Sequence, residues 1–79
     1  MKYALYYYDT CPFCQRVLQA LPKVKVEVEK RNVMTNRAYS DQQYKATGRT
    51  TVPCLLIDDN GKETWMYESA DIVRFLQSL

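Results

Sequence analysis

The 79-residue sequence predicts a single α/β domain in which a four-stranded mixed sheet carries helices on both faces. Three observations lead to this fold class. Hydrophobic periodicity changes between strand and helix along the chain, a β-α-β unit precedes a hairpin signal and a closing helix, and no linker or repeat interrupts them. At this length only about 60% of the unfolded chain's surface can be buried, which suffices for one core. We therefore expect one domain over residues 1–79, in the order β-α-β-α-β-β-α.

Residues 2–8 and 12–21 are predicted to form the first strand and the first helix. The first segment is rich in tyrosine, which favours a strand buried on both faces. The second places its apolar side chains along one helical stripe, and a proline just after it ends the helix. Pro12 suits the first helical position, because its missing N–H would be unpaired there. Either Thr10 or Cys11 is expected to cap the helix.

The middle of the chain is predicted to form a second strand and a second helix. Valines over residues 24–28 alternate with charged residues, which is typical of a half-exposed strand, and a charged turn, Lys30-Arg31-Asn32, follows. Residues 35–47 are mostly polar. The threonine and the asparagine at the start of this segment can cap a helix, and Gly48 can end it.

A hairpin and a closing helix are predicted for the last part of the chain. Apolar residues 53–57 and residues 62–67 flank Asp58-Asp59-Asn60-Gly61, whose Asn-Gly pair is a strong hairpin signal. Ser69 can cap a final helix in which apolar residues recur at i, i+3, i+4 and i+7.

Composition excludes several classes of function. The 11 lysines and arginines are interspersed with 9 acidic residues, so the sequence indicates neither nucleic-acid binding nor a membrane surface. The absence of histidine excludes His-dependent triads and imidazole zinc sites, and three cysteines are too few for a four-thiolate zinc site, so no metal is expected. The apolar run at the N-terminus is too short for a signal peptide, and no segment resembles a membrane span. We therefore expect a cytoplasmic protein.

The motif Cys11-Pro12-Phe13-Cys14 lies at the junction of the first strand and the first helix. A helix N-terminus offers unpaired N–H groups and positive potential, which lower a thiol pKa from about 8.5 to roughly 3.5 to 7.5. Cys11 is therefore the predicted nucleophile, and Cys14 is predicted to resolve the mixed disulfide. Pro12 fixes the turn that presents the thiols, and Phe13 would supply apolar contact. Arg16 adds positive potential, whereas Asp9 opposes it. A metal site is the alternative, but no second cysteine pair supports it.

Three motifs in order resemble those of the glutaredoxins, which have the thioredoxin fold. They are Cys11-Pro12-Phe13-Cys14, Thr51-Val52-Pro53 before the third strand, and Glu68-Ser69-Ala70-Asp71-Ile72-Val73 at the start of the last helix. Together with Tyr8-Asp9-Thr10, they are most similar to the N-terminal domain of glutathione-transferase-like glutaredoxins. The resemblance implies a thioredoxin-like fold and a glutathione-dependent thiol-disulfide oxidoreductase. Such an enzyme reduces protein disulfides or glutathionylated thiols, with Cys11 and Cys14 as its redox-active pair.

The resemblance also implies how glutathione would bind. Val52 would offer its backbone N–H and C=O to the peptide of glutathione, beside a cis Pro53. Glu68 and Ser69 match the positions that hold the γ-glutamyl end, where a helix N-terminus receives the carboxylate and an acidic side chain receives the ammonium.

One position departs from the family pattern. Many glutaredoxins carry a lysine three residues before the first cysteine, where it pairs with the glycine carboxylate of glutathione, but this sequence has Tyr8. Arg49 and Arg37 are the candidates to replace it, although both also fit ordinary surface positions. Two alternatives stay open: a dithiol reductant recycled by a thioredoxin reductase-type flavoprotein, and a glutathione-ligated iron–sulfur cluster that bridges two chains through Cys11.

Two further expectations concern the third cysteine and the surface. Cys54 precedes three apolar residues and is predicted to be a buried, inert thiol, with a third redox role as the alternative. Two-domain members of the family cover one face of this domain with a helical domain, which does not follow Leu79. We therefore expect either a more polar exposed face or a weak dimer.

Overall fold

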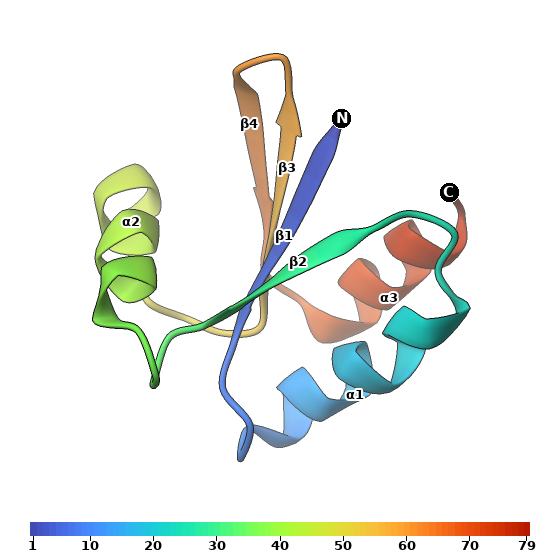
Figure 1. Cartoon of the computed structure of the whole chain (residues 1–79), viewed down its shortest axis with the longest axis horizontal. Helices are drawn as coiled ribbons and strands as arrows, with labels where there is room; N and C mark the ends of the chain where they lie inside the picture. Colours follow the sequence, from blue (N-terminus) through green and yellow to red (C-terminus); the bar gives the residue numbers. More distant parts are fainter.

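A computed structural model describes residues 1–79 and shows the predicted order of elements. The strands are β1 (Lys2–Tyr7), β2 (Val28–Asn32), β3 (Cys54–Asp59) and β4 (Lys62–Met66). The helices are α1 (Pro12–Ala20), α2 (Arg37–Thr47) and α3 (Ser69–Gln77), and a short 3-10 turn, η1 (Leu21–Lys23), follows α1. Figure 1 shows α1 and α3 side by side on one face of the sheet and α2 on the other. The prediction of helices on both faces is therefore confirmed.

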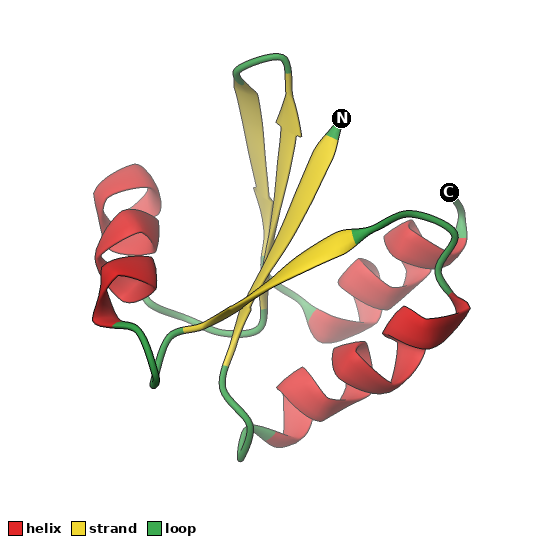
Figure 2. Ribbon diagram, in the orientation of Figure 1, coloured by secondary structure: helices red, strands yellow, loops and turns green.

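The four strands form one mixed sheet in the order β2-β1-β3-β4. β1 pairs in parallel with β2 and antiparallel with β3, and β4 closes the sheet as the second strand of a hairpin (Figure 2). Because β1 is central and covered on both faces, its residues Ala4, Leu5 and Tyr6 are all buried. The expected doubly buried first strand is confirmed.

The second strand lies later in the chain than the valine pattern predicts. β2 begins at Val28 and includes residues 30–32, which were expected to form a turn. Register explains the difference, because Tyr3 pairs with Val28 and β1 begins at Lys2. No residue of β1 lies opposite residues 24–26, so their alternating pattern has no strand to pair with.

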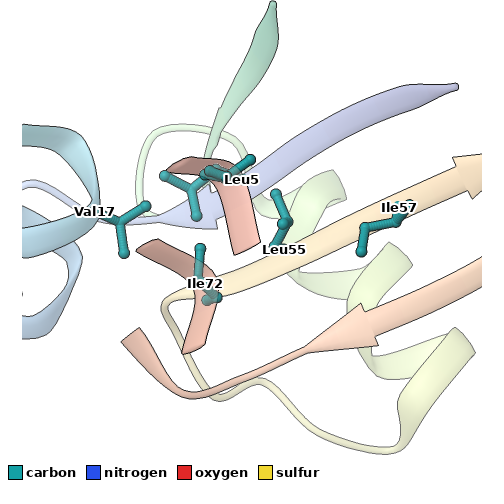
Figure 3. Packing of buried hydrophobic residues seen from close by; sticks show 6 residues of the cluster. Leu5, Val17, Leu55, Ile57 and Ile72 are labelled. Atoms are coloured by element: carbon teal, nitrogen blue, oxygen red, sulfur yellow. The ribbon is translucent and has the colours of Figure 1, made fainter. Parts of the chain in front are cut away.

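The core consists of two layers, one on each face of the sheet. Alternate residues of a strand point to opposite faces. Toward α1 and α3, six buried side chains pack together: Leu5, Val17, Leu55, Ile57, Ile72 and Leu76 (Figure 3). Toward α2, the buried set consists of Ala4, Tyr6, Cys54 and Leu56. The first layer fixes α1 and α3 against the sheet and thereby fixes the positions of their N-termini.

Local capping residues set the ends of the elements. The Asn36 side chain accepts a hydrogen bond from the N–H of Ala38 at 3.1 Å and caps α2, and Gly48 ends that helix in a left-handed conformation with φ of 73°. The hairpin turn places both Asn60 and Gly61 at positive φ, 53° and 92°. These sequence signals were therefore interpreted correctly.

The prediction for the start of α3 was wrong in one respect. Ser69 is the first residue of the helix rather than its cap, and Glu68 occupies the cap position with an extended backbone. No side chain caps this helix, although the C=O of Glu68 accepts a hydrogen bond from the N–H of Ile72 at 2.8 Å. The N–H groups of the first turn are therefore not occupied by a capping side chain.

Candidate active site

Cys11 caps α1 with its own side chain. The N–H of Cys14 donates a hydrogen bond to the Cys11 Sγ over 3.2 Å. The backbone of Cys11 is also held, since its N–H donates to the C=O of Tyr8 at 3.3 Å and its C=O accepts from the N–H of Gln15 at 3.0 Å. Pro12 occupies the first helical turn, as expected. The sulfur thus receives an amide hydrogen at the N-terminal end of α1, the position that the sequence predicted for the nucleophile.

Cys14 has a different environment, one turn inside the same helix. Its side chain is fully buried. Burial and the side-chain hydrogen bond with Cys11 raise the pKa of Cys14 to about 12, although a backbone hydrogen bond with Tyr8 acts in the opposite direction. Cys14 therefore remains a protonated thiol at neutral pH, so the two cysteines of the motif are chemically distinct.

The surroundings of the motif are apolar and basic. Phe13 projects into solvent with 57% of its surface exposed, and the Arg16 guanidinium lies 5.5 Å from the centre of its ring. Asp9, expected to oppose the positive potential, accepts a hydrogen bond from the Asn32 side-chain amide at 3.3 Å. Cys11 itself is 5% exposed, whereas both other cysteines are at 0%. Cys11 is therefore the cysteine that a substrate can reach.

The turn before β3 lies at the same end of the sheet as the cysteine motif. Cys54, the first residue of β3, pairs with Tyr6, so Pro53 and Val52 continue beside the end of β1 that leads to Cys11. The Val52–Pro53 peptide bond is cis. Pro53 is buried and Val52 is half-buried. The geometry implied for this turn by the family resemblance is present.

The start of α3 reaches the same end of the sheet. Met66 pairs with Leu55, so Tyr67 and Glu68 follow β4 toward the turn before β3. Arg49 approaches this segment, because its guanidinium lies 5.2 Å from the centre of the Tyr67 ring. Ser69 and the side chain of Arg16 line one surface depression between α1 and α3.

Arg49 and Arg37 are therefore placed differently. Arg49 stacks on the residue next to Glu68, whereas Arg37 is exposed at the first residue of α2. Tyr8, which stands in place of the family's lysine, is half-buried, and its C=O is occupied by the N–H of Cys11. Of the two basic candidates, Arg49 is the one with a contact to a neighbour of Glu68.

Cys54 is buried on the α2 face of the sheet, as predicted. Burial raises the pKa of its thiol to about 12, and a hydrogen bond with Gln43 offsets part of that effect. Because α1 packs on the opposite face through Val17, Cys54 belongs to the other core layer.

Sequence reasoning missed Gln43, the one buried residue of α2. Its side-chain Nε2 donates a hydrogen bond to the C=O of Thr51 at 2.7 Å. A signal was available in the helical spacing. Gln43 lies four residues after Tyr39, whose ring packs edge to face with Tyr6, so the two share the side of α2 that faces the sheet.

The structure was also searched for metal-binding groups and for membrane-spanning helices. No group of three or more histidine, cysteine, aspartate or glutamate side chains gathers closely enough to hold a metal ion. None of the helices combines the length and the apolar character that crossing a membrane requires.

Sequence comparison matches most of the chain. A sequence model of the glutaredoxin family matches residues 3–61. Glutaredoxin 3 of Escherichia coli is 35% identical over 54 residues, which are 68% of this chain and 65% of that protein. A probable glutaredoxin of Synechocystis is 34% identical over 59 residues, 73% of this chain and 67% of its own length. The chain thus spans about two thirds of the curated relatives that it matches.

Structural comparison covers nearly the whole chain. A trimeric glutathione transferase of Leishmania superposes on 96% of this chain and 17% of its own, with a TM-score of 0.74 and 29% identity. An epsilon-class glutathione S-transferase of the housefly, Musca domestica, superposes on 98% of this chain and 34% of its own, with a TM-score of 0.70 and 25% identity. The fold is thioredoxin-like, as in the corresponding part of these larger enzymes.

Proposed function

Because the chain belongs to the glutaredoxin family, we propose that it is a glutathione-dependent thiol-disulfide oxidoreductase acting through Cys11 and Cys14. Its proposed substrates are disulfide-bonded or glutathionylated proteins of the cytoplasm. One observation carries the proposal: the Cys11 sulfur caps α1 and Cys11 keeps 5% of its surface exposed, while the second thiol lies one turn inside the same helix and is fully buried.

The first step is attack of the Cys11 thiolate on the glutathione sulfur of a glutathionylated protein. A new Cys11–glutathione disulfide forms, the disulfide between protein and glutathione breaks, and the electron pair leaves with the protein thiolate, which takes up a proton. Phe13, exposed beside Cys11, offers apolar contact to the protein part of the substrate.

The second step releases glutathione from Cys11 by one of two routes. The thiolate of a second glutathione attacks the bound glutathione sulfur, which yields oxidised glutathione and the free Cys11 thiolate. Alternatively, Cys14 attacks the Cys11 sulfur, closes an internal disulfide and expels glutathione. In the adduct Cys11 no longer carries a thiol, so its hydrogen bond with Cys14 no longer raises the pKa of Cys14, whereas burial still does. Because a buried thiol ionises less readily, we propose that the first route dominates for glutathionylated substrates.

The glutathione site is proposed at the end of the sheet where the three motifs meet. Val52 would pair its backbone with the glutathione peptide, and the uncapped start of α3 at Ser69 would receive the γ-glutamyl carboxylate. Glu68 would pair with the ammonium group. Arg49 would supply the positive charge that Tyr8 lacks and bind the glycine carboxylate.

A trapping experiment tests the roles of the two cysteines. The Cys14→Ser variant, treated with oxidised glutathione, is expected to accumulate one glutathione adduct on Cys11, because Cys11 attacks and nothing internal resolves the product. The Cys11→Ser variant, otherwise identical, serves as the matched control and is expected to remain unmodified under native conditions. Peptide mapping by mass spectrometry reads both outcomes. The reverse pattern, with an adduct on Cys14 and none on Cys11, would overturn the assignment.

Tyr8 favours a second candidate function with the same dithiol chemistry. If no cation binds the glycine carboxylate, glutathione is a poor donor, and a thioredoxin reductase-type flavoprotein would return the internal disulfide to its dithiol form. The two candidates differ in which donor restores the Cys11–Cys14 dithiol after oxidation, glutathione or the flavoprotein with NADPH.

A further inference from the structure

Gln43 combines complete burial with an incompletely paired amide. Its exposure is 0%, and its Oε1 has no hydrogen-bond partner. An unpaired buried amide oxygen destabilises a folded chain, and an apolar side chain of similar size would avoid that loss. A residue that breaks a local packing rule in this way is expected to serve a purpose other than stability.

The other half of the amide holds the segment before β3. Its Nε2 donates to the C=O of Thr51 at 2.7 Å. Gln43 therefore holds the chain directly before Val52 and Pro53. Nearby, the Thr47 hydroxyl lies within hydrogen-bond distance of both backbone groups of Arg49, at 3.1 and 3.2 Å. Side chains of α2 thus hydrogen-bond to the connection between α2 and β3 at two residues, Arg49 and Thr51.

Peptide planarity links this hydrogen bond to the ligand. The C=O of Thr51 and the N–H of Val52 belong to one peptide unit and point in opposite directions when it is trans. The cis bond of this turn is the next one, between Val52 and Pro53. By drawing the Thr51 oxygen toward α2, the Gln43 amide directs the Val52 N–H away from α2 and out of the core.

We propose that Gln43 is a positioning residue that orients the Val52 backbone for the glutathione part of the substrate. The inference rests on the proposed function and extends it to a side chain that does not touch the ligand. Loss of the amide leaves the Thr51–Val52 peptide free to rotate, so substrate binding weakens while the chemistry at Cys11 continues.

The test compares Gln43→Met with Gln42→Met, which makes the same change at the neighbouring, exposed position of α2. With a glutathionylated peptide as substrate, Gln43→Met is expected to raise KM by about fivefold, the effect of one hydrogen bond, with kcat within about twofold of the wild type. Its midpoint of urea unfolding is expected to stay close to that of the wild type, because the unpaired Oε1 and the hydrogen bond to Thr51 are lost together. Gln42→Met is expected to leave KM unchanged.

Failure of the positioning role and failure of the proposed function give different results. An unchanged KM in a folded Gln43→Met variant, beside an active wild type, would overturn the positioning role. A lower kcat and a lower urea midpoint with an unchanged KM would also overturn it, because that pattern indicates a merely structural residue. Absence of glutathione-dependent turnover in the wild type would instead refute the proposed function.

If Gln43→Met does not fold, a second measurement tests the proposal with Gln43 intact. The glutathione adduct of Cys14→Ser is compared with its free form by NMR. The side-chain amide signals of Gln43 and the backbone amide signal of Val52 are expected to shift together on adduct formation. Shifts confined to residues 9–16, with both of these amides unmoved, would overturn the proposal.

Discussion

The three cysteines of this chain differ through their surroundings rather than through their sequence neighbours alone. Cys11 receives an amide hydrogen bond at a helix start and is slightly exposed, whereas Cys14 and Cys54 are fully buried. Burial raises the pKa of both buried thiols to about 12. Of the three cysteines, only Cys11 thus keeps any exposed surface.

The residue-scale prediction concerns Cys54 and alkaline pH. The thiol of an unfolded chain loses its proton near pH 9.0, whereas the folded Cys54 keeps its proton until about pH 12. Since the folded state binds more protons in this window, the stability that Cys54 contributes is complete below pH 9.0 and decreases as pH rises toward 12. We expect the stability advantage of the wild type over Cys54→Ala to shrink above pH 9 by up to about 1.4 kcal/mol per pH unit.

Urea unfolding from pH 7 to 10.5 measures this effect. Leu56→Ala, which removes a side chain from the same core layer without removing a titrating group, is the control. Its stability difference from the wild type is expected to stay constant with pH. Parallel pH profiles for the wild type and Cys54→Ala would contradict the prediction.

At the residue scale, the sequence indicated groups whose chemistry depends on local position. The placement of Cys11 followed from the strand-to-helix junction, and the burial of Cys54 followed from its apolar neighbours. Gln43 could not be found in the same way, because glutamine is common on exposed helices and its burial depends on how α2 packs against the sheet. The contact of Arg49 with Tyr67 depends on tertiary structure for the same reason.

At the scale of the element, starts, ends and turns were predictable where one residue type meets a steric requirement. α2 begins after its cap Asn36 and ends at Gly48, and the Asn60-Gly61 pair forms the hairpin turn. The bounds of β2 were not predictable, because the alternating valines indicate an extended segment but not its partner. Because β2 pairs with β1, it spans residues 28–32 rather than the predicted residues 24–28. The position of Ser69 within α3 was missed because serine is frequent both as a cap and at the first helical position.

The element-scale prediction concerns the end of α2. Gly48 has φ of 73°, and no heavy atom lies within 4 Å of the place where a Cβ would be, so a side chain there meets backbone strain but no clash. Gly48→Ala is expected to lower the free energy of unfolding by about 1 kcal/mol. Gly48→Asn, the matched control, is expected to lose less, since asparagine tolerates this conformation better. Urea unfolding measures both, and equal losses for the two variants would contradict the backbone explanation.

At the scale of the whole molecule, the fold brings three distant segments to one end of the sheet. The cysteine motif follows β1, the Val52–Pro53 turn precedes β3, and Glu68 follows β4 (Figure 1). The sequence implied a shared site for these segments only through their resemblance to the glutaredoxins, in which the matching positions bind glutathione.

The depression between α1 and α3 is lined mostly by polar side chains, among them Arg16, Gln19, Ser69, Arg74 and Gln77. The expectation of either a more polar exposed face or a weak dimer stays a prediction. The sequence could not place these side chains together, because their position depends on which helical faces pack against the sheet.

The most direct test of the central claim is steady-state turnover of a glutathionylated peptide by the purified chain, with glutathione, glutathione reductase and NADPH. We expect saturable turnover above the uncatalysed rate. We expect Cys11→Ser to abolish it and Cys14→Ser to retain it, because a second glutathione can release the adduct. Absence of glutathione-dependent turnover in the wild type, together with reduction of its internal disulfide by thioredoxin reductase and NADPH, would contradict the account.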